Sequence, residues 1–126
     1  RGRRARRARQ HGTEPVGRAR VFFTAEVAQR LTEQRPPVGV GDLRAQTTQV
    51  FENVKAALAA AGATLSDVVK QNTYIVNLNA EALSVIREVR GQYFPAENPP
   101  ASTLVGVTAL AFADLLIEVE VIAVVD

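Results

Sequence analysis

Residues 115–125, LLIEVEVIAVV, alternate between two rows of side chains that would face opposite sides of a β-strand. One row is wholly apolar and suits packing against helices: Leu115, Ile117, Val119, Val121, Ala123 and Val125. The other row is apolar except for two carboxylates, Glu118 and Glu120. A face exposed to solvent would not need the apolar residues of this row, and a buried face would not tolerate two carboxylates without polar partners. The stretch therefore predicts a sheet whose second face is covered by another copy of the chain, with both acids at a subunit boundary or in a cleft.

Two amphipathic helices are predicted to cover the apolar side of this sheet. The first spans residues 43–61, where apolar side chains recur at spacings of three, four and seven between an Asp42 N-cap and the terminating Gly62. Its opposite face is expected to carry Arg44, Gln46, Glu52 and Lys55. The second helix spans residues 80–94, with Asn79 as its N-cap.

Strands are predicted at residues 20–28, 68–78, 103–110 and 115–125. The order along the chain is then strand, helix, strand, helix, strand, strand. Two long helices on one face of a mixed sheet give an α+β sandwich. Tyr74 and Tyr93 are expected to serve as packing residues within it.

The composition narrows the chemistry that this fold could carry. The chain has 126 residues, enough for one domain, and contains no Cys and a single His, His11. Disulfides, thiolate catalysis and Cys-ligated metals are therefore excluded, and a His-based metal site or triad is disfavoured. We expect neither a metal nor a cofactor. No apolar run approaches the roughly 18 residues of a membrane span, and no secretory signal pattern is found, so a cytoplasmic protein without a membrane partner is expected.

Charge divides the chain in two. Residues 1–20 hold eight Arg and one Glu, a balance of +7, whereas residues 21–126 hold seven Lys and Arg against twelve acids, a balance of −5. Residues 1–19 are predicted to form an Arg-rich arm, and residues 20–126 a single domain. The arm could attach to nucleic acid through phosphates, but a solvated tail is favoured because residues 1–10 have no aromatic side chain for stacking bases.

Three stretches resemble the RidA/YjgF/L-PSP family of small trimeric proteins. They are GDLRAQTTQVFENVKAALAAAGATLSDVVKQNTYIVNL at residues 41–78, QYFPAENPPASTLVGV at 92–107 and LIEVEVIA at 116–123. The resemblance implies a chorismate-mutase-like α+β fold and a homotrimer whose sheets close into a central barrel. It also implies a small-molecule cleft at each subunit boundary, where family members with complete motifs hydrolyse enamines and imines of 2-keto acids.

Site residues are carried over from the resemblance one by one. Glu118, the first acid of IEVE, corresponds to the Glu that positions the attacking water, so it is the expected catalytic residue. Ser102 stands where the family has the Arg that holds the substrate carboxylate. Thr24-Ala25-Glu26 replaces Ser-Gly-Gln, and Arg87 replaces an Asn. The expected ligand-binding group is Ser102, Thr24, Ala25, Glu26, Arg87 and Glu120.

The missing Arg leaves the activity of this chain open. Losing a bidentate Arg–carboxylate contact removes about 1.5–3 kcal/mol of binding, so the cleft is expected to disfavour the standard substrate 2-iminopropanoate. A substitute cation from Arg87, Arg44, Arg18 or Arg20 would restore a deaminase that takes acids. Two further alternatives are RNA binding through the arm, as the family's endoribonuclease label suggests, and a structural or chaperone-like trimer without chemistry.

Overall fold

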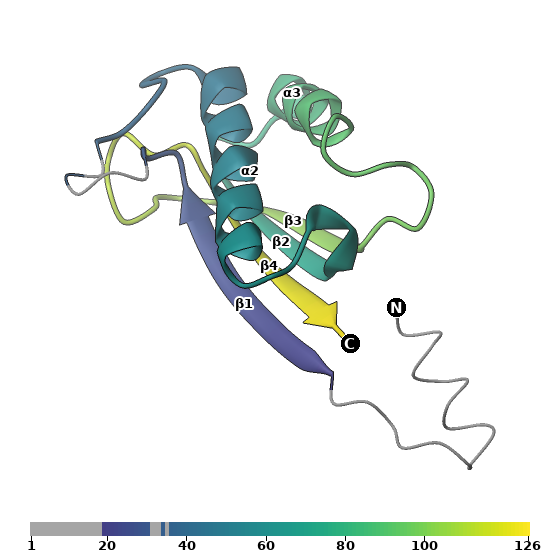
Figure 1. Cartoon of the computed structure of the whole chain (residues 1–126). Coiled ribbons are helices and arrows are strands. Elements are labelled where there is room, and N and C mark those ends of the chain that lie inside the picture. Colours follow the sequence, from purple (N-terminus) through teal and green to yellow (C-terminus); the bar gives the residue numbers. More distant parts are fainter. Residues whose placement is uncertain (1–18, 31–33, 35) are drawn as a thin grey trace, which may run out of the picture.

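The computed structural model describes residues 19–30, 34 and 36–126, which form a four-stranded sheet with helices on one side (Figure 1). In chain order the elements are β1 (Arg20–Val27), α2 (Leu43–Ala60), the 3₁₀ turn η1 (Leu65–Asp67), β2 (Val68–Val76), α3 (Ala80–Arg90), β3 (Ala101–Val107) and β4 (Ile117–Val125). The sheet order is β1-β4-β2-β3, with β4 antiparallel to both of its neighbours and β2 parallel to β3. The predicted α+β sandwich with a mixed sheet is confirmed.

Strand β4 lies in the middle of the sheet and buries the apolar row that the sequence predicted. Five of its members are at most 2% exposed: Leu115, Ile117, Val119, Val121 and Ala123. Helix α2 crosses this face, in front of β4 in Figure 1, and contributes Phe51, Val54 and Leu58 to the same core. The alternate row of β4, which carries Glu118 and Glu120, stays partly exposed on the other face.

Helix α2 has the predicted caps, but Gln46 was assigned to the wrong face of the helix. The Asp42 side chain accepts a hydrogen bond from the Ala45 N–H at 3.0 Å, and Gly62 follows the helix with a φ of 79°. Gln46, expected on the exposed face, is instead 0% exposed. Its Nε2 donates to the Asp114 carbonyl at 2.7 Å, and its Oε1 accepts from the Leu116 N–H at 2.8 Å. A glutamine whose amide is satisfied on both sides can be buried, which periodicity of apolar residues does not detect.

Helix α3 is shorter than predicted. The Asn79 side chain caps it by accepting from the Ala82 N–H at 2.8 Å, but the regular helix ends at Arg90 and not at residue 94. Turns continue to Phe94, whose N–H donates to the Arg90 carbonyl at 3.0 Å. Gly91 stands at the C-cap, where the high conformational entropy of glycine disfavours continuing the helix.

Strand ends also differ by a few residues from the prediction. Strand β2 ends at Val76 because Asn77 adopts a φ of 59°, and β3 runs from Ala101 to Val107, earlier than the predicted 103–110. No helix in the described part of the chain is both long enough and apolar enough to cross a membrane. The arm predicted at residues 1–19 lies outside the described residues except for Ala19 and stays a prediction.

Candidate functional site

The face of the sheet away from the helices gathers polar side chains of β4 and β2 beside apolar side chains of β1. Strand pairing places Glu120 of β4 between Ala25 of β1 and Asn72 of β2, and it places Glu118 opposite Tyr74 of β2. Because side chains alternate along a strand, all five of these residues lie on the open face. The structure therefore brings together three of the predicted site residues, Glu118, Glu120 and Ala25.

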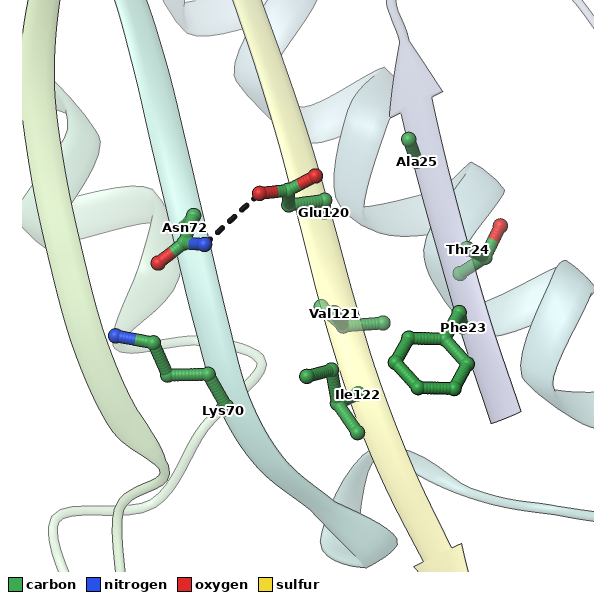
Figure 2. A pocket seen from close by; sticks show the side chains of 8 residues that line it. All are labelled: Phe23, Thr24, Ala25, Lys70, Asn72, Glu120, Val121 and Ile122. Atoms are coloured by element: carbon green, nitrogen blue, oxygen red, sulfur yellow. Dashed lines mark hydrogen bonds between the residues drawn. The ribbon is translucent and has the colours of Figure 1, made fainter. Parts of the chain in front are cut away.

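Glu120 is held by two hydrogen bonds from β2. The Tyr74 hydroxyl donates to its Oε1 at 2.5 Å, and the Asn72 amide donates to the same oxygen at 2.8 Å, as Figure 2 shows for Asn72. These two donors lower the pKa of Glu120, because they stabilise the carboxylate. The same bond raises the pKa of Tyr74, because the phenol is then harder to deprotonate. Glu120 is thus an ionised acceptor fixed to its neighbouring strand.

Glu118 differs from Glu120 in having no such partner. Its carboxylate makes no hydrogen bond or ion pair with any residue that the structure describes, although its charge contributes to raising the pKa of nearby Tyr74. The side chain is partly exposed at the start of β4, close to the 114–116 segment that Gln46 fixes. Of the two acids, Glu118 is therefore the one that has neither carboxylate oxygen bonded to a described residue, whereas Glu120 has its Oε1 bonded twice.

A cavity of about 330 Å³ lies on the open face beside Glu120 (Figure 2). Its lining residues come from β1, β2 and β4: Phe23, Thr24, Ala25, Lys70, Asn72, Glu120, Val121 and Ile122. Lys70 supplies a cation whose Nζ donates to Thr103 Oγ1 at 2.8 Å, and Phe23 is 73% exposed at the opposite wall. An apolar surface of this kind beside charged groups is typical of a face that another protein surface covers.

Two members of the Thr24-Ala25-Glu26 triplet face the other way. Thr24 pairs with Val121 and Glu26 with Val119, both of which belong to the helix-facing row. The Thr24 side chain is turned away from Phe23 in Figure 2, and its hydroxyl donates to Glu26 Oε2 at 2.6 Å. The expected ligand-binding triplet is therefore split between the two faces of β1, an edge strand of the sheet.

Ser102 lies at the opposite edge of the sheet. Ser102 is exposed on the edge strand β3 and pairs with Gln71 on the helix side of the sheet. Arg87 is exposed on α3. Within one chain, Ser102 and Glu118 are separated by β2 and lie on opposite faces, so they do not form a site together.

The sequence analysis missed the second strand's contribution to the open face. Tyr74, expected only to pack, and Asn72 both bind Glu120, and Lys70 lines the cavity. The alternation of polar residues at positions 70, 72 and 74 indicates that they share one face of the strand. Only the register with β4 shows that this face carries Glu118 and Glu120. In the part of the chain that is described, no three His, Cys, Asp or Glu side chains converge as a metal site would require.

The chain matches a known protein family over most of its length. The Endoribonuclease L-PSP family profile matches residues 17–125. A RutC family protein of Pyrococcus horikoshii is 46% identical over 83 residues, which cover 66% of this chain and 63% of that protein. A Dermatophagoides farinae protein named 2-iminobutanoate/2-iminopropanoate deaminase is 38% identical over 86 residues, which cover 68% of this chain and 64% of that protein. The matched segment thus spans less than two thirds of the length of these relatives.

Solved structures share the same architecture. The Rid family protein YyfB of Yersinia pestis superposes with a TM-score of 0.75 at 39% identity, over 86% of this chain and 80% of that one. RidA of the Antarctic bacterium Psychrobacter sp. superposes with a TM-score of 0.70 at 30% identity, over 89% of this chain and 85% of that one. The chain therefore belongs to the RidA/YjgF/L-PSP family and has its chorismate-mutase-like α+β fold.

Proposed function

We propose that this chain forms a homotrimer with small-molecule clefts at its subunit boundaries, and that Glu118 acts there as the general base in hydrolysis of an imine or enamine. The observation that carries the proposal is the contrast between the two acids of β4. Glu120 is committed to Tyr74 and Asn72, whereas Glu118 has no partner among the described residues. A named imine deaminase among the relatives favours this chemistry.

The division of the predicted site between two edges supports a shared cleft. The Thr24-Ala25-Glu26 triplet lies on edge strand β1, and Ser102 lies on edge strand β3. A head-to-tail contact would bring the β1 edge of one copy against the β3 edge of the next, and such contacts form a ring when the rotation between copies closes. The exposed apolar side chains of the open face, including Phe23 and Val105, would be covered in the same assembly.

The reaction itself needs one base and one water. The Glu118 carboxylate accepts a proton from water as the water oxygen attacks the C=N carbon, and the protonated Glu118 then gives that proton to the nitrogen, which yields an amino alcohol. The hydroxyl proton of the amino alcohol passes through Glu118 to the nitrogen as the C–N bond breaks, so that imine plus water gives a carbonyl compound plus ammonia. Ser102 brings no charge to this site, so an acid substrate would have to find its cation on another residue.

The test compares Glu118→Gln with Glu81→Gln, which removes an exposed carboxylate from the first turn of α3. Ammonia release is measured from 2-iminopropanoate and from a neutral ketimine, each generated in the cuvette, and sedimentation reports the assembly. We expect Glu118→Gln to lower kcat at least about 100-fold while the trimer persists, and Glu81→Gln to leave kcat unchanged. Equal effects of the two variants, or no turnover above the uncatalysed rate on either imine, would contradict the proposal.

A further inference from the structure

The cavity on the open face has a carboxylate in its lining that is only half used. Glu120 lines the cavity, and both of its hydrogen bonds, from Tyr74 and Asn72, end on Oε1. The other oxygen, Oε2, makes no hydrogen bond to any residue that the structure describes, and it points toward β1 in Figure 2. The two donors also lower the pKa of Glu120, so the group keeps its negative charge at neutral pH. The cavity therefore contains a fixed anionic acceptor.

Strand β1 leaves room beside this oxygen. Ala25 pairs with Glu120 across β1 and β4, and its side chain is a single methyl group. Phe23 lies two residues from Ala25 on the same face of β1, which makes it the diagonal neighbour of Glu120, a separation that aromatic side chains can span. Phe23 is 73% exposed, so most of its ring is open to a ligand. The cavity thus has an anion on its β4 side and an aromatic ring on its β1 side.

Lys70, the cation in the lining of this cavity, does not neutralise Glu120. Its Nζ donates to Thr103 Oγ1 on β3 at 2.8 Å, and no ion pair joins it to any of the described residues. Figure 2 shows the Lys70 nitrogen on the side of β2 away from Glu120. The charge of Glu120 therefore faces the cavity without a counter-ion from the described part of the chain.

An ionised carboxylate beside an exposed aromatic ring favours a small organic cation as ligand. An ammonium group donates strong, charge-assisted hydrogen bonds to a carboxylate, and the face of a Phe ring attracts a cation within about 6 Å of its centre. Ile122 lines the cavity beside Phe23 and adds apolar surface for the carbon chain of such a ligand. The volume of about 330 Å³ lies at the lower end of the range of about 300–1,000 Å³ that is typical of small-molecule sites.

We propose that this cavity binds a small organic cation, with the ammonium group on Glu120 and the carbon chain against Phe23 and Ile122. The inference deepens the proposed function and rests on it for the reaction, because Glu118 lies two residues from Glu120 on the same face, about 6.5 Å along the strand. The imine hydrolysed at Glu118 would accordingly carry an ammonium group. A neighbouring copy that covers this face would supply the outer wall of the cavity.

The first test measures binding to the full chain by titration followed with nuclear magnetic resonance. The probes are n-butylammonium, butan-1-ol and butyrate, which share a four-carbon chain and carry a positive charge, no charge and a negative charge. We expect the parent chain to bind n-butylammonium at least about tenfold more tightly than either of the other probes. Tighter binding of butyrate would make Lys70 the anchor and overturn the inference, and so would the absence of n-butylammonium binding.

The second test removes the charge of Glu120. Glu120→Gln keeps an oxygen that Tyr74 and Asn72 can bind, and it should weaken n-butylammonium binding at least about tenfold while butan-1-ol binding stays unchanged. The matched control Glu81→Gln removes an exposed carboxylate from α3 and should leave both affinities as they are. Equal n-butylammonium affinities of the parent chain and a folded Glu120→Gln chain overturn the inference.

The third test changes the aromatic wall and leaves the charge in place. Phe23→Leu keeps apolar surface but has no aromatic face, so n-butylammonium binding should fall about two- to fivefold while butan-1-ol binding stays unchanged. Circular dichroism and sedimentation establish that each variant is folded and assembled like the parent chain. If Glu120→Gln is not, the decision rests on Phe23→Leu, and an unchanged n-butylammonium affinity in that variant overturns the inference.

The two proposals fail in different ways. Loss of n-butylammonium binding in Glu120→Gln together with unchanged turnover in Glu118→Gln supports the cation site and refutes the catalytic role. Ketimine hydrolysis that depends on Glu118, with n-butylammonium affinity independent of Glu120, supports the catalytic role and refutes the cation site.

Discussion

Replacing Gln46 by Leu tests whether a single buried amide holds the start of β4 and with it Glu118. Gln46 is 0% exposed, and its amide donates to the Asp114 carbonyl and accepts from the Leu116 N–H, two residues before Glu118. Leucine has a similar volume and fills the space, but it can satisfy neither backbone group. The substitution should therefore act through lost hydrogen bonds and not through a cavity.

The magnitude follows from the two backbone groups. A buried polar group left without a partner costs about 1–3 kcal/mol. The Leu116 N–H would bear that cost in full, whereas Asp114 is an exposed residue whose carbonyl can regain water. We therefore expect Gln46→Leu to lower the free energy of unfolding by about 1–3 kcal/mol. Because β4 would begin less rigidly, Glu118-dependent turnover should also fall.

Urea unfolding at a fixed protein concentration measures the effect, since association would otherwise shift apparent stability. The control is Gln92→Leu, which changes an exposed side chain beyond the end of α3 and should alter the free energy of unfolding by no more than about 0.5 kcal/mol. If Gln46→Leu and Gln92→Leu lie within about 0.5 kcal/mol of each other, the amide does not hold the start of β4 and the reasoning fails.

Two further predictions concern the open face and the turn before α2. The pKa of Glu120 is lowered in the folded chain, so its stabilising contribution is present above the unfolded pKa and is lost as pH falls through the folded value. Tyr74→Phe removes the hydrogen bond that lowers the pKa of Glu120 most, so the variant should lose most stability at pH 7 and less stability at acidic pH. Urea unfolding at pH 7 and at an acidic pH measures the two losses. Equal losses at the two pH values would argue against the Tyr74–Glu120 bond. Gly39→Ala should destabilise more than Gly41→Ala in thermal unfolding, because both have positive φ but only Gly39 would place its Cβ 2.7 Å from the Ala45 Cβ. If the two alanine variants lower the unfolding temperature equally, the clash with the Ala45 Cβ does not contribute to the effect at Gly39.

Local patterns in the sequence were sufficient for the order of the elements and for the inner face of β4, but not for Gln46 on α2. The alternation of residues 115–125 fixed which side of β4 is buried, because side-chain direction along a strand has a period of two. Asp42, Asn79 and Gly62 marked helix ends because capping is a local hydrogen-bonding requirement. Alternation along β1 also implies that Thr24 and Glu26 face away from Ala25. Treating the three residues as one motif overlooks this difference in direction.

Only the tertiary structure decided which groups meet. Glu118 and Glu120 are equivalent in sequence, and they differ because the register with β2 puts Asn72 and Tyr74 within reach of one and leaves the other free. Asn72 and Glu120 are 48 residues apart, and no periodicity spans such a distance. The same reason explains Gln46, whose partner Leu116 is 70 residues away along the chain. The sequence alone thus determined the fold, the buried row of β4 and the candidate acids. Strand register and helix packing determined that Gln46 is buried and which of the two acids is held by β2, because those contacts exist only between segments that are distant along the chain.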